Sequence, residues 1–454
     1  MKVHIAGIGG EGWSWIAKIL LEKGWEVSGC DLSESDRVKE LYKLGLKDFY
    51  LGNSPTHIKK NLDAFLYTSA IKYNEENKKE LDEALIVGIK SYERNDFLPI
   101  LLWDMDVIAI AGTHGKTTTT SMISFLLDAL GDKCGFGIGG TSMNFGTNGR
   151  NGDSQNFVIE ADEFADAFLG LNSKFAIITS LEMDHHDYFS NFDSYIDSFC
   201  KFASNVKPGG KFLMWGDKTP TEKIKQSFLK NNSFGNFMTY GENKSNHVVI
   251  NEIEINGFET SWKFSVGNKL FKAKVPFPGK QYAYNATAAL VCCMLMGFDI
   301  DVAISKLNLF KGTGRRFQST FKNGITVVND YGHHPTELKI TVDAAKSTGK
   351  NVIVIYEPHQ YKRCAELLEE FRGVFEGVDL IQCPIYVSRE NPPYPISNED
   401  FFNITKTHTS SSMLCDSLES AISCTVSKAK SGDLILVMAV GRGDFIVNSL
   451  LERI

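Results

Sequence analysis

The sequence predicts an α/β protein of three domains. The chain has 454 residues, which is enough for two to four domains of about 100–200 residues each. Short apolar strands alternate with helical patterns in three successive series, and this rhythm is typical of parallel sheets covered by helices. We place the domain boundaries near residues 104 and 313, so the expected domains are 1–104, 105–313 and 314–454.

The expected elements follow from the apolar periodicity of each series. In the first series we expect strands at Val3–Ala6, Glu26–Cys30, Ala64–Thr68 and Leu85–Ile89, and a helix from Trp13 to Lys23. In the second we expect strands at Val107–Ala111, Phe157–Glu160 and Phe175–Thr179, followed by an antiparallel patch between about Val248 and Val275. In the third we expect strands at Ile325–Val328, Val352–Tyr356, Leu380–Cys383 and Leu434–Met438.

Composition and charge exclude several classes of protein. A hydrophobic fraction of 43% and a charged fraction of 23% lie near globular averages, which excludes a disordered, collagenous or disulfide-scaffold chain. The net charge of −7 argues against nucleic-acid and membrane partners, which select basic surfaces. No secretory signal or membrane span is visible, and nine cysteines without a Cys-x-x-Cys pair favour reduced thiols. We therefore expect a cytoplasmic protein, either a monomer or a homodimer.

A glycine-rich turn follows the first expected strand. Gly7, Gly9 and Gly12 fit the pattern G-x-G-x-x-G, with Gly10 between them, and Asp31 ends the second strand about twenty residues later. Such a turn lets a diphosphate approach the amides of the following helix. The first domain is therefore expected to be Rossmann-like. Its ligand could be a nicotinamide or flavin dinucleotide or another nucleotide diphosphate, or the turn could bind nothing.

A second glycine loop opens the central domain. It reads Gly112-Thr113-His114-Gly115-Lys116-Thr117-Thr118, behind an apolar strand and before a helix. In such a loop backbone amides surround phosphates, the lysine neutralises their charge and the hydroxyl reaches Mg²⁺. Ile110 stands where the strict pattern has its first glycine. We expect a P-loop ATPase-like domain that binds a nucleoside triphosphate.

Two polar clusters follow in the same domain, Glu160–Glu163 and Asp184–Asp187. Ligand sites collect at the carboxyl ends of parallel strands. Thr117, Glu160 and His185 could therefore meet at one Mg²⁺ or Mn²⁺ ion. The alternative for either cluster alone is solvated loop charge. A zinc site needs three or four His or Cys ligands, and no spacing in the sequence supplies them.

The order of these motifs resembles the Mur ligases of peptidoglycan synthesis over nearly the whole chain. Within that family the chain looks most like the branch that adds alanine to UDP-N-acetylmuramate. The segments that carry the resemblance are Gly7–Gly10, Gly112–Thr120, Glu160–Glu163, Asp184-His185, Gly314–Gln318, Asp330–Glu337 and Pro358–Arg363.

The resemblance implies a UDP-sugar on the N-terminal domain, ATP with Mg²⁺ on the central domain, and L-alanine on a Rossmann-like C-terminal domain. It implies that Gly9, Gly10, Gly12, Asp31 and the turn with Ser69 contact the UDP-sugar. The reaction would pass the γ-phosphoryl group of ATP to the lactyl carboxylate, and the alanine amine would then displace phosphate. Such a route depends on charge neutralisation and positioning.

The family also implies individual roles. Residues 112–118 would bind ATP, with Lys116 acting on the transferring phosphoryl group, Thr117 and Glu160 on one metal ion, and His185 on a second ion. Asn285 would contact adenine, and Arg316 and Asp330 would reach ATP. His333 would donate to a phosphate, and His359 and Arg363 would orient the alanine carboxylate. Surface salt bridges and strand-end caps are the alternative roles for the polar residues after 313.

Several positions depart from the family pattern. They are Glu11, Trp13 and Trp15 at the first glycine turn, Lys280, Gln281 and Tyr282 before Asn285, Gln360, and Arg442. The bulk at Trp13 and Trp15 could narrow the UDP-sugar pocket. Three other functions stay open: a Mur ligase that joins a recycled tripeptide to the same sugar, a nicotinamide-dependent oxidoreductase, and a regulatory nucleotide-binding module without catalysis.

Overall fold

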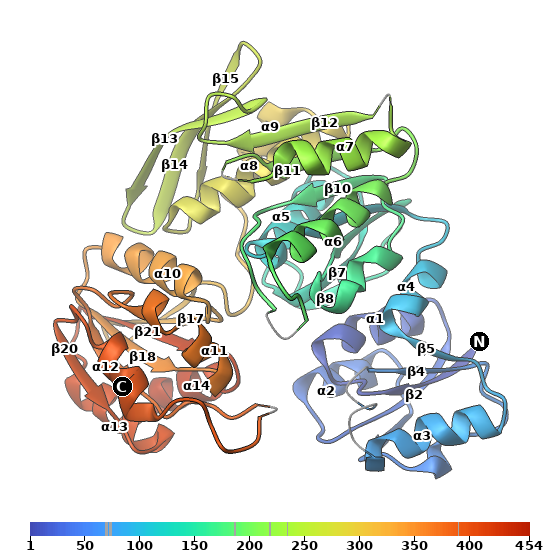
Figure 1. Ribbon diagram of the computed structural model, residues 1–454, viewed down its shortest axis with the longest axis horizontal. Coiled ribbons are helices and arrows are strands. Elements are labelled where there is room, and N and C mark those ends of the chain that lie inside the picture. The colour runs from blue at the N-terminus through green and yellow to red at the C-terminus, as the bar shows by residue number, and fades with distance from the viewer. Residues whose placement is uncertain (69–70, 72–74, 186–187, 218, 234, 389) are drawn as a thin grey trace. The chain divides into compact units, whose positions relative to one another are not determined.

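The computed structural model describes residues 1–68, 71, 75–185, 188–217, 219–233, 235–388 and 390–454 (Figure 1). Ser69 lies outside these described residues. The strands form three sheets with helices on their faces, so the predicted α/β class is confirmed. The chain divides into two compact units. The first unit is Met1–Asn251, Phe264–Phe271 and Asn285–Leu309, and the second unit is Glu252–Lys263, Lys272–Tyr284 and Phe310–Ile454.

The first sheet is parallel and has the strand order β3-β2-β1-β4-β5. Its strands are β1 (Lys2–Ala6), β2 (Glu26–Asp31), β3 (Asp48–Leu51), β4 (Ala64–Tyr67) and β5 (Ser91–Glu93). The helices of this part are α1 (Glu11–Glu22), α2 (Asp36–Lys43), η1 (Pro55–His57), α3 (Glu75–Ile86) and α4 (Arg94–Leu101). Both glycine-turn elements, β1 and α1, lie where the periodicity predicts them.

The strand predicted at Leu85–Ile89 is wrong. Helix α3 extends to Ile86, and the strand of this part begins only at Ser91. Leu81 and Ala84 are buried whereas Leu85 and Ile86 are exposed, which is the spacing of a one-sided helix and not of a strand. Gly88, with φ of 76°, then turns the chain. The apolar run looked strand-like because it contains β-branched residues at the end of the helix.

The second sheet has the order β15-β14-β13-β12-β11-β10-β6-β9-β7-β8. Its strands are β6 (Asp106–Ala111), β7 (Gly135–Ser142), β8 (Thr147–Arg150), β9 (Asn156–Glu160), β10 (Phe175–Ile178), β11 (Lys211–Trp215), β12 (Asn236–Gly241), β13 (Val248–Asn256), β14 (Glu259–Val266) and β15 (Lys269–Val275). Its helices are α5 (Lys116–Ala129), η3 (Phe164–Gly170), α6 (Phe192–Ser204), α7 (Thr221–Asn231), α8 (Lys280–Leu295) and α9 (Ile300–Leu307). Two-residue connections starting at Gly257 and Gly267 join β13, β14 and β15, and only antiparallel neighbours allow such short connections.

The third sheet has the order β16-β17-β21-β18-β19-β20 and is parallel except for the β16–β17 hairpin. Its strands are β16 (Gln318–Lys322), β17 (Ile325–Asp330), β18 (Val352–Glu357), β19 (Asp379–Gln382), β20 (Ser411–Leu414) and β21 (Leu434–Ala439). Its helices are α10 (Pro335–Ser347), α11 (Tyr361–Glu366), η4 (Leu368–Phe371), α12 (Asn398–Thr405), α13 (Leu418–Lys428) and α14 (Gly443–Arg453). Among the described residues, no helix has the length and apolar character that a membrane span requires.

Trp13 and Trp15 of α1 are buried in a hydrophobic core shared by residues of the first and second sheets. Trp15 lies against two strands of the second sheet at glycines. A Cβ atom on Gly137 or on Gly149 would lie 2.8 Å or 2.6 Å from Trp15 atoms. The two indoles therefore serve packing in this core.

Candidate active site

The phosphate loop connects the buried strand β6 to the start of α5. Gly112 has φ of 125° and Gly115 has φ of 84°, conformations that side chains other than glycine rarely adopt. A Cβ atom on Gly115 would lie 2.5 Å from Oδ1 of Asn285 on α8. The loop is therefore folded tightly against α8, and the predicted adenine-contacting residue Asn285 lies beside it.

Lys116 extends back over its own loop. Its Nζ donates to the carbonyl oxygens of Gly112 and Thr113, at 2.6 Å and 3.2 Å, and to Oε1 of Glu163 at 2.9 Å. Burial disfavours the charge on Lys116, but the carboxylates around it outweigh burial and raise its pKa. The lysine thus stays charged at the position where a phosphate loop neutralises phosphates.

Thr117 and Glu160 lie opposite each other, as the sequence predicts. The Thr117 hydroxyl donates to Oε1 of Glu160 at 2.9 Å, and the backbone amide of Gly139 donates to Oε2 at 2.7 Å. The second bond fixes the carboxylate with one oxygen toward the start of α5. A hydroxyl and a carboxylate oxygen are the donors that Mg²⁺ or Mn²⁺ accepts beside a nucleotide, so this pair fits the expected metal ion.

Glu163 is the most enclosed carboxylate of this site, and it is fully buried. Burial raises its pKa in spite of the nearby Lys116. Nε2 of His185 lies 3.8 Å from Oε1 of Glu163 and 4.0 Å from Oδ2 of Asp184, and the Tyr195 hydroxyl donates to Glu163 at 3.4 Å. The predicted second metal ligand, His185, therefore lies among carboxylates, an environment that favours a bound cation.

Two loop residues contact the segment after β10. The Thr113 hydroxyl donates to the carbonyl oxygen of Glu182 at 2.8 Å, and Nε2 of His114 lies 2.8 Å from Oε2 of the same residue. The backbone amide of His114 donates to the Ser180 hydroxyl at 2.8 Å. These contacts hold the first half of the phosphate loop against the segment after β10.

Arg94, at the start of α4, is a residue that the sequence analysis missed. Its NH2 lies 3.5 Å from Oδ2 of Asp162, and a Cβ atom on Gly12 would lie 2.8 Å from its NH1. Arg94 therefore links the first glycine turn to the acidic cluster after β9. No local pattern singles out this arginine, because both partners are distant in sequence.

The first glycine turn is closed by the acidic residue predicted for it. The amide of Gly9 donates to Oδ2 of Asp31 at 2.9 Å, and the amide of Leu32 donates to its Oδ1 at 2.7 Å. Glu11 pairs with Arg37 at 2.8 Å on the exposed side of α1. Asp31 thus orients the turn itself, and Gly10 caps α1.

In the second unit, Asp330 ends β17 and is buried. Its carboxylate accepts from the amides of Phe317 and Gly332, both at 2.8 Å, and burial raises its pKa. The guanidinium groups of Arg315 and Arg316 lie over the Tyr331 ring, at 4.6 Å and 5.0 Å from its centroid. The predicted pair Arg316 and Asp330 therefore belongs to one turn that the buried carboxylate holds in shape.

His333 lies directly before α10. Its amide donates to Oε2 of Glu337 at 3.1 Å, and its Nδ1 lies 3.2 Å from the carbonyl oxygen of Tyr331. His334 caps the helix by accepting from the amide of Thr336 at 3.3 Å. The imidazole of His333 is thus held at a helix N-terminus, where positive backbone groups favour anions.

His359 and Arg363 lie side by side, with His359 before helix α11 and Arg363 within it. The guanidinium NH1 of Arg363 lies 3.5 Å from Nδ1 of His359, and the His359 ring stacks on Tyr386 at 5.8 Å. Arg442 lies over the same tyrosine at 5.2 Å and donates to Oε1 of Glu357 at 2.6 Å. Sequence reasoning noted Arg442 only as a departure from the family, and it missed Tyr386 and Glu357.

Tyr282, one of the residues before Asn285 that depart from the family pattern, has a packing role. Tyr282 is buried, stacks on Phe277 at 4.8 Å and donates to the carbonyl oxygen of Arg316 at 2.9 Å. Gln360 has φ of 68° and precedes α11. The described site residues thus form three groups: the first glycine turn and the phosphate loop in the first unit, and the residues after 313 in the second unit.

The phosphate loop, its lysine and the carboxylates around it define an enzyme of the nucleotide-dependent α/β class. Sequence models of known families make the assignment narrower. The Mur ligase family catalytic domain matches residues 2–103, the Mur ligase middle domain matches 110–293, and the Mur ligase glutamate ligase domain matches 315–441.

Relatives that match over nearly the whole chain support the same family. The chain is 33% identical over 460 residues to a UDP-N-acetylmuramate–L-alanine ligase of Agathobacter rectalis, covering 100% of this chain and 98% of the relative. It is 35% identical over 449 residues to one of Clostridium acetobutylicum, covering 98% and 95%. The chain therefore belongs to the Mur ligase family.

Solved structures share the fold. The UDP-N-acetylmuramate–alanine ligase of Thermotoga maritima has a TM-score of 0.80 at 22% identity, covering 100% of this chain and 99% of its own. A murein peptide ligase of Psychrobacter arcticus has a TM-score of 0.71 at 22% identity, covering 100% and 98%. A MurF ligase of Thermotoga maritima in complex with ADP has a TM-score of 0.64 at 16% identity, covering 88% and 96%.

Proposed function

We propose that this chain joins L-alanine to the lactyl carboxylate of UDP-N-acetylmuramate, with conversion of ATP to ADP and phosphate. The observation that carries the proposal is the similarity of the whole chain to ligases named for this reaction. The contacts around the phosphate loop and around His359 supply the chemistry that the reaction needs.

The first step transfers the γ-phosphoryl group of ATP to the carboxylate and gives an acyl phosphate and ADP. Lys116 supplies a fixed positive charge at the loop that binds the phosphates, and its raised pKa keeps that charge through the neutral range. Thr117 and Glu160 would hold Mg²⁺ or Mn²⁺, and His185 would hold a second ion. A bound divalent ion neutralises phosphate charge. Asn285, Arg316, Asp330 and His333 are proposed to position ATP and the transferred phosphate.

In the second step the amine of alanine attacks the acyl carbon, and phosphate leaves. A small zwitterion offers little surface, so its carboxylate must supply most of its binding. The neighbouring His359 and Arg363 can donate charged hydrogen bonds to that carboxylate. Arg442, which shares Tyr386 with His359, adds a second guanidinium to the same cluster.

The sugar nucleotide is proposed to bind at the first glycine turn, with Gly9, Gly10, Gly12 and Asp31, and with Ser69 beyond the described residues. Because Asp31 closes the turn through Gly9, we propose that it shapes the site for the diphosphate. All nine cysteines are free, which fits a reducing cytoplasmic compartment.

Phosphate release from ATP tests the proposal. The purified full chain is assayed with Mg²⁺, with UDP-N-acetylmuramate and L-alanine each present or absent. Release that requires both substrates supports the ligase. Release that requires a tripeptide in place of alanine would assign the chain to the peptide-recycling ligases, whose fold it shares, and release without the sugar nucleotide would contradict the proposal.

A further inference from the structure

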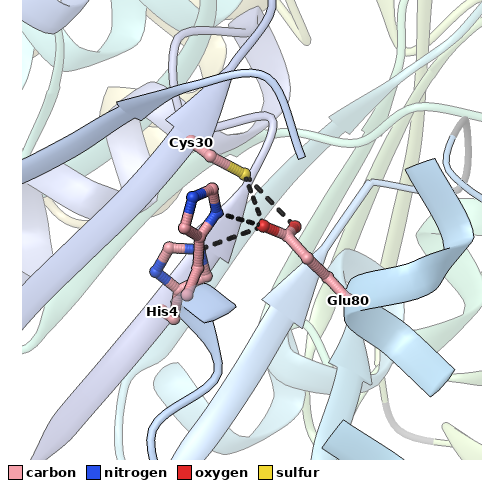
Figure 2. Close-up of side chains that lie close together, drawn as sticks. His4, Cys30 and Glu80 are labelled. Atoms are coloured by element: carbon pink, nitrogen blue, oxygen red, sulfur yellow. Dashed lines mark hydrogen bonds and ion pairs between the residues drawn. The ribbon is translucent and has the colours of Figure 1, made fainter. Parts of the chain in front are cut away.

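Four potential metal ligands meet in the first sheet, away from the phosphate loop. They are His4 on β1, Cys30 on β2, His57 on η1 and Glu80 on α3. One ligand atom from each lies within 4.8 Å of all the others. Figure 2 shows Cys30 and His4 pointing at the Glu80 carboxylate from neighbouring strands. His4, Cys30 and Glu80 are fully buried, so solvent does not compete for this site.

The distances suit one small ion. In a tetrahedral zinc site with bonds of about 2.0–2.3 Å, neighbouring ligand atoms lie about 3.3–3.8 Å apart. Sγ of Cys30 lies 3.4 Å and 3.2 Å from the two Glu80 oxygens, and Nε2 of His4 lies 3.8 Å from Oε1. Nδ1 of His57 is closer, at 2.5 Å from Oε1. His57 ends the short turn η1, and its ring stacks on Tyr50 at 4.2 Å.

The tautomer of His4 leaves its inner nitrogen as a ligand atom. The Ser28 hydroxyl has one proton and donates it to the carbonyl oxygen of Val3 at 3.2 Å. Ser28 therefore accepts from Nδ1 of His4 at 2.9 Å. The neutral ring then presents a lone pair at Nε2, and this buried atom has no hydrogen-bond partner within the described residues. A histidine whose other nitrogen is held by a hydrogen bond is the usual form of a metal ligand.

Glu80 is held in place by donors outside the cluster. The amide of Ser54 and the side-chain amide of Asn53 each donate to it at 3.1 Å. The cluster places Nε2 of His4 and Sγ of Cys30 against this same carboxylate, at 3.8 Å and 3.2 Å. It therefore combines a buried carboxylate with a lone pair that faces it, which is an arrangement that a cation would relieve.

We propose that His4, Cys30, His57 and Glu80 bind one Zn²⁺ ion that stabilises the N-terminal sheet. One thiolate, two imidazole nitrogens and one carboxylate oxygen suit zinc, whereas Mg²⁺ and Ca²⁺ prefer oxygen ligands alone. On binding, Cys30 releases its thiol proton to solvent. The charges of the ion, the thiolate and the carboxylate then sum to zero, as a buried site requires.

The ion has a structural role in this arrangement. Four protein ligands leave no open position for a substrate. They join two neighbouring strands, a turn and a helix. The glycine turn directly follows β1, and Asp31 ends β2. Zinc binding is thus proposed to stabilise the framework of the first glycine turn, independently of the ligase chemistry.

Metal analysis tests this inference. The full-length protein is expressed in medium supplemented with zinc, purified and dialysed before its zinc content is measured. We expect about one zinc ion per chain, as a closed site of this kind retains its metal. Cys30→Ser should lose the ion. Cys134→Ser should keep it, because Cys134 is equally buried but lies outside the cluster. Zinc retained by Cys30→Ser, or lost equally from both variants, would contradict the assignment.

A second test uses only the wild-type protein, so it does not depend on whether Cys30→Ser folds. The protein is stripped of metal with a chelator, and Co²⁺ is then added. Co²⁺ bound by a thiolate gives a near-ultraviolet charge-transfer band, and tetrahedral Co²⁺ gives intense visible bands. We expect both, together with a rise in Tm when Zn²⁺ is added to the chelated protein. A wild-type chain that contains no zinc, gives no cobalt bands and keeps its Tm on zinc addition would overturn the proposal.

Discussion

Replacing Lys116 by Met separates its catalytic role from its structural role. The Lys116 side chain is 15% exposed and Glu163 is fully buried, so the variant leaves a carboxylate without its cation. Breaking such a buried pair costs about 3–5 kcal/mol of unfolding free energy. Loss of one fixed charge at a transferring phosphoryl group lowers kcat by roughly 10²–10³. Lys116→Met should therefore show both losses.

The double variant Lys116→Met/Glu163→Gln should recover most of the stability and none of the turnover. The Gln side chain keeps the volume of Glu163 and removes its charge, so the buried site no longer contains an unpaired carboxylate. Urea unfolding gives the free energies, and phosphate release gives kcat on the same preparations. Near-normal turnover in either variant would refute the phosphate-loop assignment, and an unstable double variant would refute the pairing argument.

The pH dependence of the single variant follows from Glu163. Burial raises the pKa of this carboxyl above its ordinary 4.5, and losing Lys116 raises it further. A carboxyl with a raised folded-state pKa binds more protons in the folded chain than in the unfolded chain. The instability of Lys116→Met should therefore be small near pH 4.5 and grow as the pH rises toward neutrality. A loss of stability that is constant over this range would contradict the cause.

Three further changes give distinct results. Glu160→Gln should raise the Mg²⁺ concentration needed for half-maximal activity at least tenfold, measured by metal titration, while full activity in excess chelator would exclude a metal site here. Arg363→Lys should raise the KM for L-alanine about tenfold with little change in the KM for ATP, because Lys cannot form paired bonds to a carboxylate; an unchanged alanine KM would place the carboxylate site elsewhere. Trp15→Ala should lower the unfolding free energy by about 3–5 kcal/mol in urea titrations, whereas the exposed Trp103→Ala should change it little.

The sequence predicted those features that depend on neighbours along the chain. Strands such as β6 and β18 contain runs of buried apolar residues, and the loop at Gly112 sits between a strand and a helix, so local pattern was sufficient. The approach of Thr117 to Glu160 followed from the rule that parallel strands end at one edge. His359 and Arg363 also lie close together, but His359 precedes helix α11, so their contact does not come from helical spacing.

The features that were missed depend on contacts between distant segments. Arg94 meets Asp162 across 68 residues. The four ligands of the proposed zinc site lie on four different elements, so no spacing along the sequence could reveal the site. At Leu85–Ile89 the local signal itself misled, because residues with strand propensity end a helix. Tertiary packing decided each of these cases.

The packing of Trp15 against Gly137 and Gly149 limits how this chain can be recombined with its relatives. The indole occupies the volume that two side chains would otherwise fill. A chimera that takes residues 1–104 from a relative with a small side chain at position 15 would leave a void beside bare glycines. A chimera that has larger residues at 137 and 149 but keeps Trp15 would contain a steric clash with the indole. Residues 15, 137 and 149 must therefore be exchanged together. A working chimera has to take this part of the central domain along with the N-terminal domain.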